Sequence, residues 1–450
     1  MPYVAAVVLG LLTPVVGVLC YTRVQAGIAL ILGMYAFEAL YMFVGGISLG
    51  ISLYYTDFAL MFVLAIALLR ILLDKNRPAL NPAWVVCSSV AAFSLLSGFA
   101  AYGSGAGVQA RPYFYFFAAT IYPMTFGINV QTLRFLLNSM VWLAVLLLCI
   151  TGYRWVVYFT PIRDLLPPEG SYNNDGPIRV IRSYETLVLA QILMAGVFFN
   201  RAAGATSLLL ARALSPVLLA AVLVLQHRSV WVAAAAGVLS SLFVARLRGG
   251  SALGQSLLLI FIAATIALPI FVSDELSGVG GQITNSAGAA LAEKGSAGER
   301  VNSWNEIVKN WAMAGPRSVA VGQSFGADPT RYVKDEAGAT RKLTYTAHNM
   351  YVQTLFSMGL LGLGSFLWAS VYVVTGLYRI CVSPQATSSD QLLLVMVLTQ
   401  LVYYVPYGTD YLQGLIFGIA LTYVAGHPVC VAIRDRRDVK GRKFTKWKLL

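Results

Sequence analysis

One histidine in this sequence stands in a spacing that suits acid–base chemistry. His348 is followed by Asn349 and, after nine further residues, by Gly359 and then Gly362. A neutral imidazole can take a proton from an attacking hydroxyl near neutral pH. If the run is helical, Gly359 projects about 20° from His348 and Gly362 about 40° to the other side. We therefore expect His348 in the first turn of a helix, where the dipole disfavours imidazolium, with two glycines that let a neighbouring helix approach.

Three arginines stand where phosphate recognition is possible. Arg228 lies in a short turn between two apolar segments, and Arg300 lies in a long polar segment. Arg182 follows Arg179 and comes just before another apolar segment. Guanidinium groups bind phosphate oxygens in pairs and keep their charge in partly dry surroundings. The plainer interpretations are snorkelling to lipid headgroups for Arg228 and an ordinary solvated charge for Arg300.

The elements that must position these residues are membrane helices. Of the 450 residues, 58% are hydrophobic and 11% are charged, whereas a soluble domain has about 25% charged residues. This composition excludes a soluble enzyme and a protein with a single membrane anchor. Since helices and closed barrels alone satisfy their own backbone in lipid, we expect an all-α polytopic protein with about 12 spans. The apolar runs are 3–20, 24–44, 58–73, 83–101, 113–131, 133–151, 183–199, 206–226, 229–245, 256–272, 347–372, 391–407 and 410–431.

One of these runs is ambiguous. The run 113–131 contains Pro123, Gly127 and Asn129. These residues interrupt the apolar pattern, so the run is either a span or a re-entrant segment.

Charge predicts the orientation of the chain. Residues 433–450 carry eight lysines and arginines against two aspartates, which gives 8 − 2 = +6 of the chain's net +13. Such a tail favours the cytoplasmic side, beside anionic headgroups, and nucleic-acid binding need not be invoked. The membrane domain is then 1–432, and the polar segments 152–182 and 273–346 lie outside the cytoplasm. Loops this long usually carry function.

The histidine motif carries a resemblance to a known family. His348-Asn349, nine residues and Gly359-x-x-Gly362 resemble the H-[NSQ]-x9-G-x-x-[GTY] signature of the O-antigen ligase superfamily, which also includes O-antigen and exopolysaccharide polymerases. The layout is similar too, with many spans and a long periplasmic loop, here 273–346, ahead of the motif. The landmarks cover about residues 180–372. The resemblance implies a GT-C-like membrane glycosyltransferase in the bacterial inner membrane.

The resemblance also implies a reaction. Such enzymes move a glycan from undecaprenyl pyrophosphate to a sugar hydroxyl at the periplasmic face. Arg228 and Arg300 correspond to the arginines of two periplasmic loops, and with Arg182 we expect them to stabilise the pyrophosphate leaving group. His348 is then the general base, and direct attack inverts the anomeric centre. The extracytoplasmic segments contain no DxD motif or cluster of metal ligands, so we expect a reaction without metal or cofactor.

The acceptor remains open at this point. An O-antigen ligase transfers onto lipid A-core, whereas a polymerase transfers onto another undecaprenyl-linked glycan. A transporter of lipid-linked glycans is a third possibility, although its two halves would usually be related. Asp57 is expected to cap a helix rather than assist an acceptor. Four aromatic residues near the motif either stack on sugars or anchor the chain at the membrane interface: Tyr345, Tyr351, Trp304 and Trp311.

Overall fold

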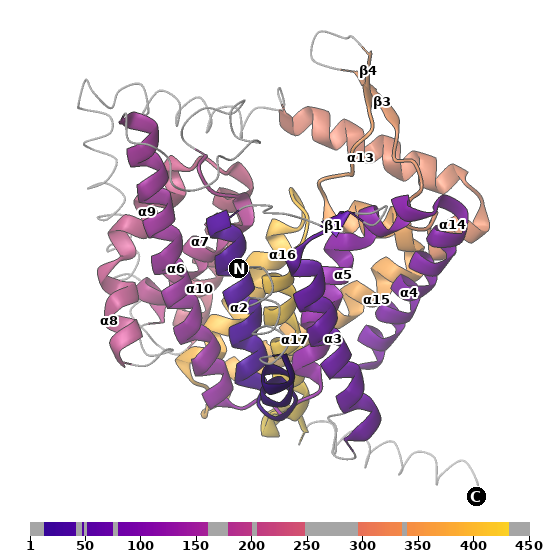
Figure 1. The fold of residues 1–450 in the computed structure, drawn as a ribbon. Coiled ribbons are helices and arrows are strands. Elements are labelled where there is room, and N and C mark those ends of the chain that lie inside the picture. Colours follow the sequence, from indigo (N-terminus) through magenta and orange to yellow (C-terminus); the bar gives the residue numbers. More distant parts are fainter. Residues whose placement is uncertain are drawn as a thin grey trace, which may run out of the picture.

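In the part of the chain that the structure describes, the protein is a bundle of helices with two short pairs of antiparallel strands. The computed structural model describes residues 13–41, 47–48, 52–74, 80–160, 179–199, 205–247, 296–334 and 340–431. Figure 1 shows helix α13 (Ser296–Met313) and the hairpin of β3 (Arg331–Lys334) and β4 (Thr340–Leu343) together at one end of the bundle. The expected span 256–272 and the basic tail 433–450 lie outside the described residues.

The remaining elements follow the apolar runs of the sequence. The first described helix is Thr13–Thr22. The elements up to the first long polar segment are α2 (Val24–Tyr41), β1 (Ile47–Ser48), β2 (Ser52–Leu53), α3 (Tyr55–Leu73), α4 (Pro82–Tyr102), α5 (Ser104–Met124) and α6 (Val130–Phe159). Those after it are α7 (Ser183–Phe198), α8 (Ala205–Ala213), α9 (Ser215–Val224), α10 (Arg228–Leu247), α14 (Pro316–Val321), α15 (Met350–Cys381), α16 (Ser388–Tyr403) and α17 (Tyr411–Gly426).

Five of the described helices are long and apolar enough to cross a membrane, namely α3, α4, α6, α10 and α15. Shorter apolar helices, including α2, α7, α16 and α17, pack between them. Many large apolar side chains on the bundle surface are exposed, among them Leu72 and Leu96, which is the arrangement that lipid contact requires. The all-α, multi-pass architecture is confirmed, and the total of about 12 spans stays a prediction.

Two apolar runs fold differently from the expectation. The run 206–226 is divided into α8 and α9, because Pro216 stands in the first turn of α9, where its missing N–H costs nothing. The run 113–131 is divided between two helices. Its first part belongs to α5, which ends at Met124, and Asn129 accepts a hydrogen bond from the Thr132 backbone N–H at 2.9 Å to cap α6.

An aromatic core joins the helices that carry the site. Trp84 of α4 lies 5.5 Å from Phe417 of α17, and Phe366 of α15 lies 5.9 Å from the same ring. The α5 helix approaches α17 so closely that the Thr120 hydroxyl donates to the Gly414 carbonyl at 2.9 Å. These contacts fix the helices α4, α5, α15 and α17 relative to one another.

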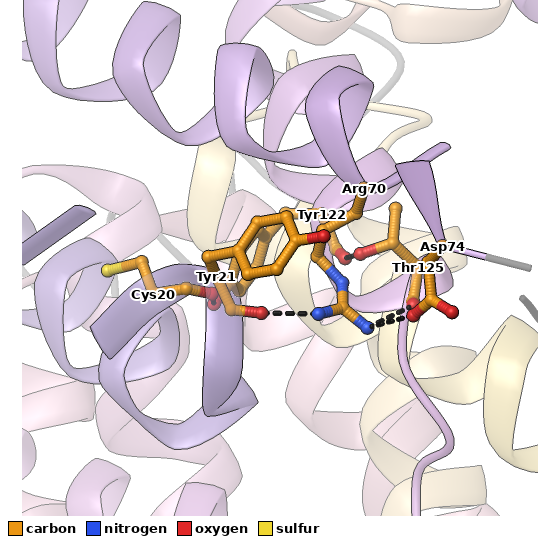
Figure 2. A network of polar contacts seen from close by, with 6 residues as sticks. All are labelled: Cys20, Tyr21, Arg70, Asp74, Tyr122 and Thr125. Carbon is orange, nitrogen blue, oxygen red and sulfur yellow. Dashed lines mark hydrogen bonds and ion pairs between the residues drawn. The ribbon is translucent and has the colours of Figure 1, made fainter. Parts of the chain in front are cut away.

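Arg70, near the C-terminal end of α3, ties three segments together (Figure 2). Its guanidinium donates to the carbonyls of Tyr21 and, at 3.1 Å, of Thr125, and it pairs with Asp74 at 3.1 Å. It also lies 3.8 Å from the ring centroid of Phe126. Both terminal nitrogens of this guanidinium are therefore used inside the protein.

Candidate active site

His348 lies before its helix and not within it. The first helical residue is Met350, and Asn349 is the N-cap, whose side chain accepts from the Val352 N–H at 3.0 Å. His348 itself has a φ of +45°, in the left-handed region. The expectation that His348 occupies the first helical turn is therefore wrong. The N-cap residue Asn349 has a non-helical backbone, so His348, which precedes it, lies outside the helix.

The glycines of the motif do not lie on one straight helix face. Gly359 has φ +63° and ψ −166°, which places a kink inside α15. A Cβ atom on Gly359 would come within 2.4 Å of the Ala320 carbonyl oxygen and 2.5 Å of the Gly322 nitrogen. Another segment does approach α15 closely at Gly359, as expected. That segment is the end of α14 with Gly322, and not a membrane helix.

Gly322 makes the same contact from the other side. It has φ +82°, and a Cβ atom on it would lie 2.3 Å from the carbonyl carbon of Ser357. The next residue, Gln323, donates its N–H to the Phe356 carbonyl at 2.8 Å. The polar segment ahead of His348 is thus anchored on the kink of α15, backbone against backbone.

The third glycine of interest, Gly362, lies near a membrane helix. Its carbonyl lies 3.9 Å from the Cys87 sulfur of α4. A Cβ atom on it, however, would lie 2.3 Å from the Cβ of Met358 in α15 itself. Of the two motif glycines, Gly359 therefore makes room for another segment, whereas Gly362 makes room within its own helix.

Hydrogen bonds on both sides hold the backbone of His348. The Trp304 indole donates to the Ala347 carbonyl at 2.7 Å, and the Ala347 N–H donates to the Gln353 side chain at 3.3 Å. On the other side, the Met350 N–H lies 2.9 Å from the Tyr404 carbonyl and 3.1 Å from that of Tyr407. Left-handed backbone costs about 1–3 kcal/mol outside glycine and persists where the surroundings enforce it.

The imidazole is exposed between two tyrosines. Its ring centroid lies 5.3 Å from that of Tyr345 and 6.0 Å from that of Tyr407. Partial removal from water, followed by the positive charges of Arg300 and Arg331, lowers the pKa of His348 below its ordinary value of 6.5. At neutral pH the ring is therefore an uncharged base that a ligand can reach.

Several arginines surround Tyr407. Arg300 donates to the Pro406 carbonyl at 3.1 Å, and Arg179 donates to the Gln226 carbonyl at 3.3 Å. The charge of Arg228, the first residue of α10, interacts with those of Arg179 and Arg300. The structure thus brings Arg228 and Arg300, far apart in sequence, to the end of the bundle where His348 lies.

Helix N-termini meet at the same place. Ser183, the first residue of α7, lies 3.1 Å from the Ser229 hydroxyl of α10 and 2.7 Å from the Tyr403 hydroxyl of α16. The helices α7, α10 and α15 all begin here, so the positive ends of their dipoles add to the arginine charges. Such a combination favours an anion.

The comparison with protein families finds a match in this part of the chain. Residues 213–367 match the family model described as O-antigen ligase. This part of the chain is therefore similar to the O-antigen ligase family. The match covers about a third of the chain and includes His348, Arg228, Arg300 and the motif glycines. The comparison with curated proteins finds no match.

Arg182 has a different environment from Arg228 and Arg300. It is the N-cap residue of α7, and its backbone N–H donates to Glu185 at 2.8 Å. Its guanidinium lies 3.9 Å from the Glu38 carboxylate of α2 and also donates to the Tyr184 hydroxyl. The structure places it beside carboxylates, in the wall of a neighbouring cavity.

Two further arginines matter for the site and were not expected from the sequence. Arg331 is 2% exposed and donates to the Ser303 hydroxyl at 2.6 Å and to the Tyr345 carbonyl at 2.6 Å, next to His348. Arg154, near the end of α6, donates to the Val180 carbonyl at 2.6 Å and so holds the segment before α7. The sequence does contain one indication of a role for Arg154, since it is a single arginine just after an apolar run.

Of the aromatic and acidic candidates, one contacts His348 and the others stabilise the surrounding fold. Tyr345 packs on the His348 ring. Trp304 supports the backbone of Ala347, Trp311 donates to the Ser318 carbonyl at 2.9 Å, and Tyr351 donates to the Leu401 carbonyl at 2.7 Å. Asp57 caps α3, as expected, by accepting the Tyr54 N–H at 2.7 Å. Within the described ranges, no group of three or more histidines, cysteines or acids is arranged to hold a metal.

Proposed function

We propose that this protein is a membrane glycosyltransferase that moves a glycan from undecaprenyl pyrophosphate to a sugar hydroxyl of lipid A-core, as an O-antigen ligase does. The observation that carries the proposal is the position of His348. It is an exposed, uncharged imidazole beside Arg300, inside the matched domain, at the end of the bundle where three helices begin. A base next to an anion site is what such a transfer needs.

The proposed reaction follows from these groups. His348 takes the proton of the acceptor hydroxyl as its oxygen attacks the anomeric carbon. The bond from that carbon to the pyrophosphate oxygen breaks, and Arg228 and Arg300 stabilise the negative charge that collects on the leaving group. One direct displacement inverts the anomeric centre. The reaction draws on the pyrophosphate linkage and proceeds without metal or cofactor, so exhaustive chelation leaves the rate unchanged.

The proposed sidedness puts His348 at the periplasmic face of the inner membrane and the basic tail 433–450 in the cytoplasm. The charge pattern of the spans supports it. Arg246 and Arg379 lie in the last turns of α10 and α15, whereas Arg228 and His348 stand at the starts of the same helices. Basic residues at the far ends agree with the positive-inside tendency. The other partners are then membrane lipids, and no nucleic acid is involved.

The acceptor decides between ligase and polymerase. The experiment is incubation of the reconstituted protein with an undecaprenyl-linked glycan, with and without lipid A-core, followed by gel analysis. A product that requires lipid A-core supports a ligase. A ladder formed without it would assign the polymerase reaction, in which a second undecaprenyl-linked glycan accepts. Recovery of all of the donor unchanged in both samples would contradict the proposed transfer.

A further inference from the structure

A separate cavity of about 280 Å³ lies beside the site. This volume is at the low end of the roughly 300–1,000 Å³ found for small-molecule pockets. The ends of α2, α3, α7 and α17 and the middle of α5 form its walls. The charged residues that line it are Glu38, Arg111, Arg182 and Asp410.

Both arginines of this cavity have carboxylate partners. Arg111 lies 3.3 Å from the Asp57 carboxylate, and Arg182 lies 3.9 Å from that of Glu38. Glu38 also accepts from the Tyr411 hydroxyl at 2.9 Å. Because the positive charges are already balanced, the cavity offers little to a phosphate, in contrast to the surroundings of Tyr407.

The carboxylate of Asp410 retains an unused acceptor. The residue is 7% exposed, and its Oδ1 accepts from the Gln413 N–H at 2.8 Å to cap α17. Its Oδ2 is shielded from water and has no hydrogen-bond partner among the residues that the structure describes. Burial raises the pKa of Asp410 to about 7, so above this pH the group is a carboxylate with one oxygen that lacks a donor, which is costly. A ligand hydroxyl that bonded to the carboxylate would remove this cost through a charge-assisted hydrogen bond.

The remaining wall is aromatic. Tyr115 and Tyr411 lie 6.0 Å apart, ring to ring, and Tyr184 lines the cavity as well. Tyrosine combines a flat apolar face with a polar tip. Flat rings and hydroxyl acceptors together suit a sugar ring, which has apolar C–H faces and hydroxyl groups around its edge.

The cavity lies near the proposed reaction site. Asp410 is three residues after Tyr407, whose ring packs against His348. A second, open groove of about 760 Å³ is lined by Tyr345, and Pro112 lines both the groove and the cavity.

We infer that the cavity binds one uncharged sugar ring of a substrate glycan, with the Asp410 carboxylate in its wall accepting a sugar hydroxyl. The inference rests on the proposed function for the identity of the glycan. It assigns Arg182 to the wall of a sugar site and leaves the pyrophosphate to Arg228 and Arg300. The sugar belongs either to the acceptor or to the donor, and both share this chemistry.

The test measures binding of free glycans to the full-length protein in nanodiscs. The probes are the core oligosaccharide released from lipopolysaccharide and the oligosaccharide released from the undecaprenyl-linked donor, each observed by saturation-transfer NMR. Asp410→Asn keeps an acceptor oxygen for the Gln413 cap and replaces the other oxygen with a donor. We expect one probe to bind, and Asp410→Asn to weaken its binding about tenfold or more.

Asp390→Asn is the matched control. Asp390 is also a buried capping aspartate, at the start of α16, but both of its oxygens are used, by the Thr387 N–H and the Tyr423 hydroxyl. Equal weakening by both variants, or none by Asp410→Asn, would overturn the inference. So would failure of both probes to bind the wild-type protein. His348→Asn should abolish transfer and keep probe binding, so this readout stays valid even if the proposed function fails.

Discussion

The rings of His348 and Tyr407 lie 6.0 Å apart, although 59 residues separate them in the chain. The contact exists because the Met350 N–H is within hydrogen-bond distance of the carbonyls of Tyr404 and Tyr407. It joins the start of α15 to the connection between α16 and α17. The proposed base is therefore positioned by a segment outside the matched O-antigen ligase domain.

His348→Asn should abolish transfer while leaving the fold intact. Asparagine tolerates the left-handed backbone that this position requires, but it cannot act as the base, and we expect the rate to fall about 10²- to 10⁴-fold. The measurement is product formation from the undecaprenyl-linked donor. His427→Asn, at the far end of α17, is the control and should keep wild-type activity. Transfer at the wild-type rate by the His348 variant would rule out the base assignment.

Arg300→Lys and Arg228→Lys should each slow transfer although they retain the positive charge. An ammonium group cannot bind phosphate with two parallel donors, and we expect the rate to fall about tenfold for each variant. Arg317→Lys, on the exposed surface of α14, is the matched control and should be silent. Equal rates for all three variants would mean that the proposed pyrophosphate contacts do not exist.

The pH profile of transfer should report the surroundings of His348. Partial removal from water, followed by the charges of Arg300 and Arg331, lowers the pKa of His348. The neutral base therefore persists as the pH falls. We expect the acid limb of the profile to lie below pH 6.5. Arg300→Gln removes one of these charges, so the pKa should rise and the limb should move to higher pH. Arg317→Gln should leave the limb in place. A limb that stays fixed in Arg300→Gln would contradict this coupling.

Gly359→Ala should destabilise the protein. The new Cβ would lie 2.4 Å from the Ala320 oxygen at a φ of +63°, and such strain and overpacking cost about 1–3 kcal/mol. Thermal unfolding in detergent measures the effect. Gly364→Ala in the same helix is the control, because a Cβ there meets no heavy atom within 4 Å. An unfolding temperature that is lowered equally by both substitutions would argue against a special role for the kink.

Much of the architecture could be predicted, because few backbone structures satisfy their own hydrogen bonds in lipid. Each apolar run with described residues became helical, including the run 113–131, which departs from the expected ends. The exact ends depended on local chemistry that hydropathy does not record. Asn129 and Pro216 are examples, since each stands at the start of a helix inside one of the expected apolar runs.

The site was harder to predict than the fold. The motif around His348 identified the right region, but a helical projection assumes an unbroken helix, and both Asn349 and Gly359 break it. Arg182 and Arg300 have different surroundings because of carboxylates that are remote in the sequence. Glu38, which pairs with Arg182, is 144 residues away from it in the chain. Arg331 gave no local signal, because its partners come together only when α13 packs on β3.

The crossing of Gly322 and Gly359 also has a mechanical consequence. Since the two backbones touch without side chains between them, the polar segment around Gly322 is held tightly against α15, about ten residues beyond His348. We therefore expect this contact to persist when a large lipid-linked substrate enters, so that any rearrangement takes place in parts of the polar segment farther from the crossing.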